Sequence, residues 1–182
     1  MEKLIKNSIS PLFDGLINMI CIKTQRLTVT PIVKDDEKAY YDLYTDEKLN
    51  EFWGYDYKKD LPIDPTPTDF YEFMISLKEK GEEISFAVRL NGVMIGELVA
   101  YNFSNMPSCE VGYRFFKKYH GKGYAIESAS ALIDYIVNNL GAKAVFTRCF
   151  KQNTPSYNLA KKLGYTLYSE DKTHYYFIKV IN

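Results

Sequence analysis

Residues 109–125 of the chain, CEVGYRFFKKYHGKGYA, decide the fold. The first eight residues are rich in aromatic side chains and predict a strand over 109–116. The turn at 120–123 then holds two glycines, and apolar residues at helical spacing begin directly after it. The start of a helix presents free backbone N–H groups, and the helix dipole favours an anion there. The stretch therefore predicts a phosphate-binding turn between a strand and a helix.

The flanking segments continue an alternation of strands and helices. Asn91-Gly92 is the preferred two-residue turn of a β-hairpin. The other expected elements are a strand at 20–33, helices at 35–49 and 68–81 around a Pro-rich loop at 50–67, strands at 84–90 and 93–101, a helix ending at Gly141, a strand at 144–150, a helix at 154–164, and a closing hairpin at 165–168 and 175–180. This order predicts one α/β (α+β) domain on a mixed sheet. We expect the domain at 20–182, after an N-terminal extension at 1–19.

The composition narrows the class of protein. The 182 residues carry a formal net charge of +0, which gives no basic excess for nucleic acid. Three cysteines without a CxxC pair favour a reducing compartment, and two distant histidines predict no metal site. No apolar run approaches the roughly 20 residues that a membrane span requires. We therefore expect a cytoplasmic protein without a membrane or nucleic-acid partner.

The glycine turn does not by itself identify the phosphate ligand. The Walker pattern requires a longer glycine spacing and a Lys-Ser/Thr pair, and neither is present. The dinucleotide pattern GxGxxG fails because no third glycine follows Gly123 at that spacing. The charges of Lys117, Lys118 and Lys122 favour a diphosphate, while a plain tight turn remains the alternative.

Several motifs in order resemble one known family. The turn HGKGYA at 120–125 resembles the acetyl-CoA signature of the GNAT N-acetyltransferase superfamily. The strand at 109–119 and the segment NTPSYNLAKKLGY at 153–165 resemble the neighbouring motifs, and TQRLTVTP at 24–31 resembles the Rim-type branch of ribosomal-protein N-acetyltransferases. The resemblance covers roughly residues 20–181. It implies a mostly antiparallel twisted sheet flanked by helices, acetyl-CoA as cosubstrate, and an amine as acceptor.

The resemblance also implies a set of cofactor-binding residues. The main chain of the strand is expected to pair with the pantetheine arm, the turn to bind the pyrophosphate, and Asn153 to bond the arm. The implied residues are Tyr113, Arg114, Phe115, His120, Gly121, Lys122, Gly123, Tyr124, Ala125 and Asn153. His120 departs from the family, which usually has Arg or Gln there. Histidine still donates a hydrogen bond but lacks the fixed charge of arginine.

Two residues are candidates for catalysis. Glu110 matches the Glu of the Rim-like branch and is the candidate base for the amine proton. The alternative is an ion pair with Arg114 on the same strand face, in which case Glu110 would act through a water molecule. Ser156 is the candidate acid for the leaving thiolate, with Tyr157 as a weaker alternative. Ala160 stands where many family members carry a catalytic Tyr.

The identity of the acceptor is the feature that the sequence determines least. We expect the loop 50–67 to wall the acceptor site through Trp53, Tyr55 and Tyr57, with acidic Glu51, Asp56, Asp60 and Asp64 attracting a cation. An α-amine, which titrates near ~8, loses its proton more easily than a lysine amine near ~10.4. A protein N-terminus is therefore the leading acceptor. The alternatives are a small amine (a polyamine, amino sugar or amino acid) and a non-catalytic acyl-CoA-binding domain. A homodimer is compatible with the family.

Overall fold

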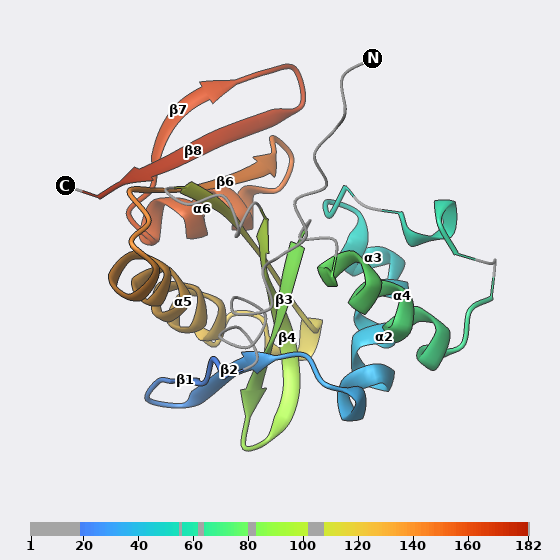
Figure 1. Ribbon diagram of the computed structural model, residues 1–182. Helices are drawn as coiled ribbons and strands as arrows, with labels where there is room; N and C mark the ends of the chain where they lie inside the picture. Colours follow the sequence, from blue (N-terminus) through green and yellow to red (C-terminus); the bar gives the residue numbers. More distant parts are fainter. Residues whose placement is uncertain (1–18, 55, 62–63, 80–82, 102–107, 182) are drawn as a thin grey trace, which may run out of the picture.

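The computed structural model describes residues 19–54, 56–61, 64–79, 83–101 and 108–181 (Figure 1). Three predictions fall outside these residues: the extension before Met19, the contribution of Tyr55 to the acceptor wall, and the end of a helix at Gly81.

One eight-stranded sheet in the described residues forms the centre of the fold (Figure 1). Its spatial order is β1-β2-β3-β4-β5-β6-β8-β7. Neighbouring strands are antiparallel except β5 and β6, which are parallel. The strands are β1 Ile22–Lys23, β2 Leu27–Pro31, β3 Glu83–Leu90, β4 Val93–Tyr101, β5 Ser108–Phe115, β6 Ala144–Phe150, β7 Thr166–Glu170 and β8 His174–Val180. The mixed, mostly antiparallel α/β architecture expected from the sequence is confirmed.

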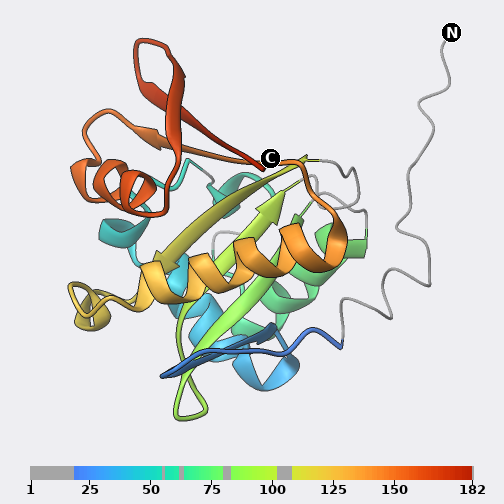
Figure 2. The ribbon, with the colours of Figure 1, turned by 90° about the vertical axis from the view of Figure 1, so that its left-hand side faces the viewer.

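Helices cover both faces of the sheet. One face carries α5 (Tyr124–Leu140) and α6 (Thr154–Lys162), and α5 runs across the strands in Figure 2. The other face carries α2 (Glu37–Thr45), α3 (Glu47–Asn50) and α4 (Pro67–Glu79). Short 3-10 turns are η1 Lys34–Asp36, η2 Tyr57–Lys59 and η3 Lys117–Tyr119. Each layer buries its own apolar cluster against the sheet, which places the strands between two cores.

Several local predictions hold in the structure. Asn91 and Gly92 have φ of 51° and 82°, which is the left-handed backbone that the predicted β3–β4 hairpin turn requires. Helix α5 buries the apolar face read from the sequence and ends at Gly141, whose φ is 76°. The closing hairpin is formed by β7 and β8.

The predicted helix at 35–49 is divided into α2 and α3. Asp46 adopts an extended backbone and its carboxylate accepts hydrogen bonds from the N–H groups of Lys48 and Leu49, both at 3.1 Å. A new helix start is therefore built at Asp46, and the chain turns there. This turn brings α3 to the rim of the cavity described below.

Two further boundaries differ from the sequence prediction. The strand expected at 20–33 is the short hairpin β1–β2, because Thr24 closes a tight turn with its N–H 2.9 Å from the carbonyl of Leu27. Helix α4 begins at Pro67 because Thr66 and Asp69 cap each other: the Thr66 N–H lies 3.0 Å from Asp69 Oδ2, and the Asp69 N–H lies 3.2 Å from Thr66 Oγ1.

Candidate active site

The main cavity lies where β5 and β6 separate. Their ladder joins Ser108–Glu110 to Ala144–Phe146, while β5 remains paired with β4 as far as Phe115. A cavity of about 760 Å³ is lined by the parts of both strands beyond this ladder, together with the starts of α5 and α6 and the end of α3. The unpaired edge of β5 presents main-chain groups to this cavity, and such an edge can bind an extended ligand as a further strand would.

The glycine turn forms one end of the cavity. Gly121 and Gly123 have φ of 73° and 80°, a region that side chains other than glycine rarely adopt. A Cβ atom on Gly121 would meet no atom within 4 Å, so open space faces this residue. Tyr124 begins α5 directly afterwards, and the first N–H groups of a helix have no intrahelical acceptor. The turn therefore provides the donors and the room that a pyrophosphate requires.

The sequence analysis did not identify an ion pair that holds this turn. Glu127 in the first turn of α5 accepts hydrogen bonds from Thr24 Oγ1 at 2.6 Å and from Arg26 Nε at 2.7 Å. Arg26 also donates to the carbonyl of Lys122 at 3.0 Å. Burial alone would raise the pKa of Glu127, but the hydrogen bonds from Thr24 and Arg26 outweigh it and lower the pKa. Arg26 thereby neutralises a carboxylate that would otherwise repel an anion.

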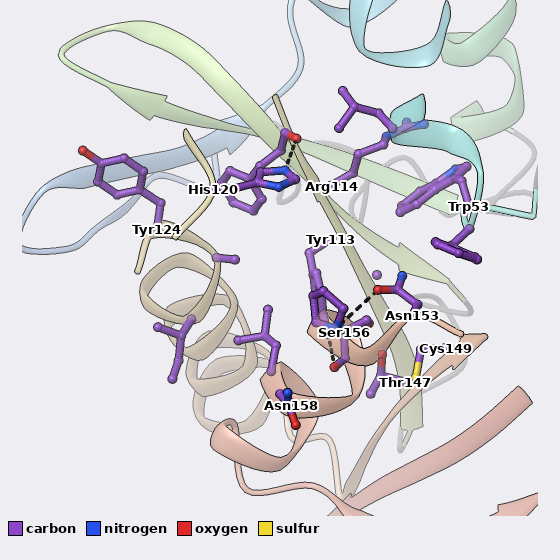
Figure 3. Close-up of a pocket in the computed structure, with 18 of the residues that line it drawn as sticks. Trp53, Tyr113, Arg114, His120, Tyr124, Thr147, Cys149, Asn153, Ser156 and Asn158 are labelled. Atoms are coloured by element: carbon purple, nitrogen blue, oxygen red, sulfur yellow. Dashed lines mark hydrogen bonds between the residues drawn. The ribbon is translucent and has the colours of Figure 1, made fainter. Parts of the chain in front are cut away.

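His120 fastens the turn to the end of β5. Its Nε2 lies 2.8 Å from the carbonyl oxygen of Phe115, so Nε2 carries the proton that is donated (Figure 3). His120 lines the cavity while it makes this bond. The side chain therefore orders the turn, and the binding role predicted for it stays a prediction.

Three polar side chains gather between β5 and α6 (Figure 3). The Tyr113 hydroxyl lies 3.0 Å from Ser156 Oγ, and Asn153 caps α6 by accepting from the Ser156 N–H at 3.2 Å. Burial raises the pKa of the Tyr113 hydroxyl to about 12. Burial also raises the pKa of the neighbouring Cys149 thiol, and a hydrogen bond with Ser156 offsets part of this rise. The cavity thus contains protonated donors beside Ser156.

The alternative acid, Tyr157, lies elsewhere. Its ring packs edge-on against Tyr175 and Phe177 at centroid distances of 5.0 and 5.4 Å, and it is not among the residues that line the cavity. The neighbouring Ala160 is buried in the core. Of the two candidate acids, Ser156 is the one that the structure brings to the cavity.

Glu110 lies at the other end of the cavity, with an ion-pair partner other than Arg114. Its Oε1 is 3.2 Å from Nε of Arg148 on β6, and the two side chains are 28% and 58% exposed. The alternative pairing with Arg114 is wrong. Arg114 lies on the same strand face as Glu110, but its Nη2 is 2.6 Å from Oε2 of the fully buried Glu97, its cross-strand neighbour on β4. The sequence could not reveal these two ion pairs, because Glu97 and Arg148 are each distant along the chain from the residue that they pair with.

Arg114 belongs to a buried cluster that holds α3 against the sheet. Its guanidinium carbon lies 3.7 Å from the centre of the Tyr44 ring and 4.1 Å from that of Trp53. It also donates to the side-chain oxygen of Asn50. Since the Arg114 side chain is 2% exposed, its charge is used in the ion pair with Glu97 inside this cluster. A cofactor contact from residue 114 therefore has to come from its main chain.

The acceptor wall agrees with the sequence prediction only in part. Trp53 lines the cavity, together with Phe52, Leu49 and Lys48. Tyr57 instead packs into the core beneath α2 and α4, with its ring 5.8 Å from that of Phe70. The four acidic residues expected to attract a cation are not among the lining residues, namely Glu51, Asp56, Asp60 and Asp64.

Two features are absent from the described residues. No group of three or more His, Cys, Asp or Glu side chains in them is arranged to hold a metal ion. Within the same residues, no helix is long and apolar enough to cross a membrane.

Comparison with known proteins identifies the family. The model of the acetyltransferase (GNAT) domain matches residues 26–166. The uncharacterized N-acetyltransferase YnaD of Bacillus subtilis is 27% identical over 145 residues, which are 79% of this chain and 81% of YnaD. The chain therefore belongs to the GNAT acetyltransferase family. It is an acetyltransferase with acetyl-CoA as cosubstrate, as the resemblance implied.

Two solved structures share the fold at low sequence identity. The ribosomal L7/L12 α-N-protein acetyltransferase RimL, solved with coenzyme A, has a TM-score of 0.73 at 16% identity and covers 89% of this chain and 98% of its own. Spermidine N-acetyltransferase from Vibrio cholerae, solved with CoA and spermine, has a TM-score of 0.73 at 14% identity and covers 85% and 95%. The fold is thus shared by enzymes that act on protein and on small-molecule amines.

Proposed function

We propose that this enzyme transfers an acetyl group from acetyl-CoA to a primary amine, and that the amine is the α-amine of a peptide or protein N-terminus. The observation that carries the proposal is the cavity between β5 and β6, which has an anion-binding turn at one end and a carboxylate at the other. The acyl donor would be held by the amides that follow Gly123, by the edge of β5 and by Asn153.

The chain's own residues supply the two proton transfers of this reaction. Glu110 accepts the proton that the attacking amine loses, directly or through a water molecule. Ser156 donates a proton to the departing thiolate and is replenished by the Tyr113 hydroxyl, 3.0 Å away. In RimL the same fold acts on a protein N-terminus, which supports the same acceptor class here.

The acceptor end favours a peptide because it is open. Glu110 and Arg148 are 28% and 58% exposed at the mouth of the cavity, so a chain attached to the amine has a way out. Free thiols at Cys21, Cys109 and Cys149 agree with a cytoplasmic location. Homodimer formation and the absence of a nucleic-acid partner stay predictions.

The test measures release of the CoA thiol with a panel of acceptors: peptides with free N-termini, the same peptides N-terminally blocked but carrying lysine, and spermidine. We expect turnover with free N-termini, and a fall of about 10²–10⁴-fold in Glu110→Gln at saturating substrate. Turnover that requires lysine or spermidine would reject the α-amine proposal. Binding of acetyl-CoA without turnover on any amine would establish the non-catalytic alternative.

A further inference from the structure

The charged side chains at the acceptor end have an excess of positive charge. Glu110 is the single carboxylate among the described residues that line the cavity, whereas Lys48 and Arg148 both carry a positive charge there. The positive charge of Arg114 is already matched by Glu97 outside the cavity. An acceptor with several positive charges is therefore poorly matched.

Arg148 has donors that its ion pair does not use. Its contact with Glu110 runs through Nε, at 3.2 Å from Oε1. Within the described part of the chain, its two terminal nitrogens donate no hydrogen bond to protein groups. A guanidinium presents these nitrogens as a planar fork that matches the two oxygens of a carboxylate. The terminal nitrogens of Arg148 are thus available to an anionic group beside Glu110.

Aromatic side chains lie on one side of this position. On β6, alternation places Arg148 on the same strand face as Phe146 and Phe150. The Phe150 ring packs at a tilt against His174, at a centroid distance of 4.1 Å, and lies 5.9 Å from the Phe52 ring of the acceptor wall. These rings provide an apolar surface beside the ion pair for the rest of an acceptor.

We infer that the acceptor is an amine that also carries a carboxylate, which binds the terminal nitrogens of Arg148 while Glu110 takes the amine proton. The inference rests on the proposed function. Two kinds of molecule contain this chemistry: a free amino acid, and a peptide with an acidic residue near its N-terminus. With either molecule, Arg148 would contact the acceptor carboxylate through its terminal nitrogens and Glu110 through Nε. These two contacts would position the amine beside Glu110.

The test compares kcat/KM for matched acceptor pairs that differ only in the carboxylate. One pair is an amino acid and its amide, and the other is a short peptide with Glu near the N-terminus and the same peptide with Gln. Charge-assisted hydrogen bonds predict a preference of about 10-fold to 100-fold for the carboxylate form. A preference in the second pair alone supports the peptide acceptor of the proposed function, whereas a preference in the first pair assigns a free amino acid and overturns that acceptor class.

Variants of Arg148 and Lys161 test whether the preference for the carboxylate form depends on Arg148. Arg148→Gln should reduce the preference to near unity, while Arg148→Lys, which keeps the charge without the fork, should retain a part of it. Lys161→Gln, which removes a positive charge from the exposed face of α6, should leave the preference unchanged. Equal rates for both members of each pair, or equal losses for both in Arg148→Gln, would overturn the inference. Absence of turnover with every amine would instead reject the proposed function.

Discussion

The pair of hydroxyls from Tyr113 and Ser156 illustrates how single residues shape the chemistry of the cavity. Because burial raises the pKa of Tyr113 to about 12, this hydroxyl keeps its proton throughout the neutral range. It lies 3.0 Å from Ser156 Oγ, so a proton lost by Ser156 can be restored locally. The cavity therefore holds two neighbouring hydroxyls, although position 160 is Ala.

Replacement of these hydroxyls gives the first prediction. Ser156→Ala should lower kcat by about 10²-fold, a loss typical of a missing proton donor. Tyr113→Phe should lower kcat less, because Ser156 remains. Both are measured by thiol release at saturating acetyl-CoA and acceptor. Tyr157→Phe is the matched control, since Tyr157 packs on Tyr175 and Phe177. A larger loss in this control than in Ser156→Ala would assign the acid to Tyr157.

At the scale of elements, the start of α5 depends on a turn that only glycine fits. A Cβ on Gly123 would lie 3.3 Å from Arg26 Nη2, in addition to the strain of a φ of 80°. Gly92 has nearly the same φ of 82°, but a Cβ there would meet nothing within 4 Å. Substitution of Gly92 therefore tests backbone strain alone, whereas substitution of Gly123 adds a change in the turn that starts α5.

The second prediction uses this pair. Both Gly123→Ala and Gly92→Ala should lower the melting temperature through strain of about 1–2 kcal/mol, and Gly123→Ala should lower it at least as much because its Cβ also meets Arg26. Only Gly123→Ala should also weaken acetyl-CoA binding, measured by titration calorimetry. Wild-type affinity in Gly123→Ala would argue against pyrophosphate binding at this turn.

The link between the β1–β2 turn and α5 gives a prediction on pH. The pKa of Glu127 is lowered because the hydrogen bonds from Thr24 and Arg26 outweigh its burial. A carboxylate whose pKa is lower in the folded state stabilises above its usual value of 4.5, and this stabilisation is lost as the pH falls through the lowered pKa.

Glu127→Gln should accordingly lower the melting temperature at neutral pH, and the difference from wild type should shrink as the pH falls below 4.5. Asp134→Asn, an exposed carboxylate change on the same helix, should show a much smaller effect. A difference for Glu127→Gln that stays constant over the whole pH range would show that its charge is not the cause.

The sequence predicted most elements because their signals are local. The Asn91-Gly92 turn, the apolar face of α5 and the Pro155 that opens α6 each act within a few residues. The division of the first long helix was missed, although Asp46 is a standard N-cap residue, because the helical pattern continues on both sides of it.

For the whole molecule, the buried pair Arg114–Glu97 connects the sheet to the helical layer that walls the cavity. Glu97 is 0% and the Arg114 side chain 2% exposed, and the guanidinium lies between the Tyr44 and Trp53 rings. Removal of one partner leaves the other charge buried without compensation.

Arg114→Met or Glu97→Leu alone should therefore destabilise the fold by about 3–5 kcal/mol, measured by urea unfolding. The double variant should recover a large part of this loss, because two apolar side chains replace the ion pair. Equal stability of single and double variants would show that the two residues are not coupled.

The ion pairs of the cavity were beyond the reach of sequence analysis. Glu110 pairs with Arg148 and Arg114 pairs with Glu97, and both choices follow from the three-dimensional register of the strands. Arg26 and Glu127 are 101 positions apart. By contrast, Gly121 and Gly123, which the sequence singles out, do line the cavity, because the main chain of one continuous segment builds that part of it.

The measurement that tests the central claim most directly is release of the CoA thiol from acetyl-CoA by the purified enzyme with a panel of primary amines. We expect turnover with at least one α-amine, and we expect Glu110→Gln to lower this turnover by about 10²-fold or more. Wild-type turnover in Glu110→Gln, or no thiol release with any amine despite acetyl-CoA binding, would contradict it.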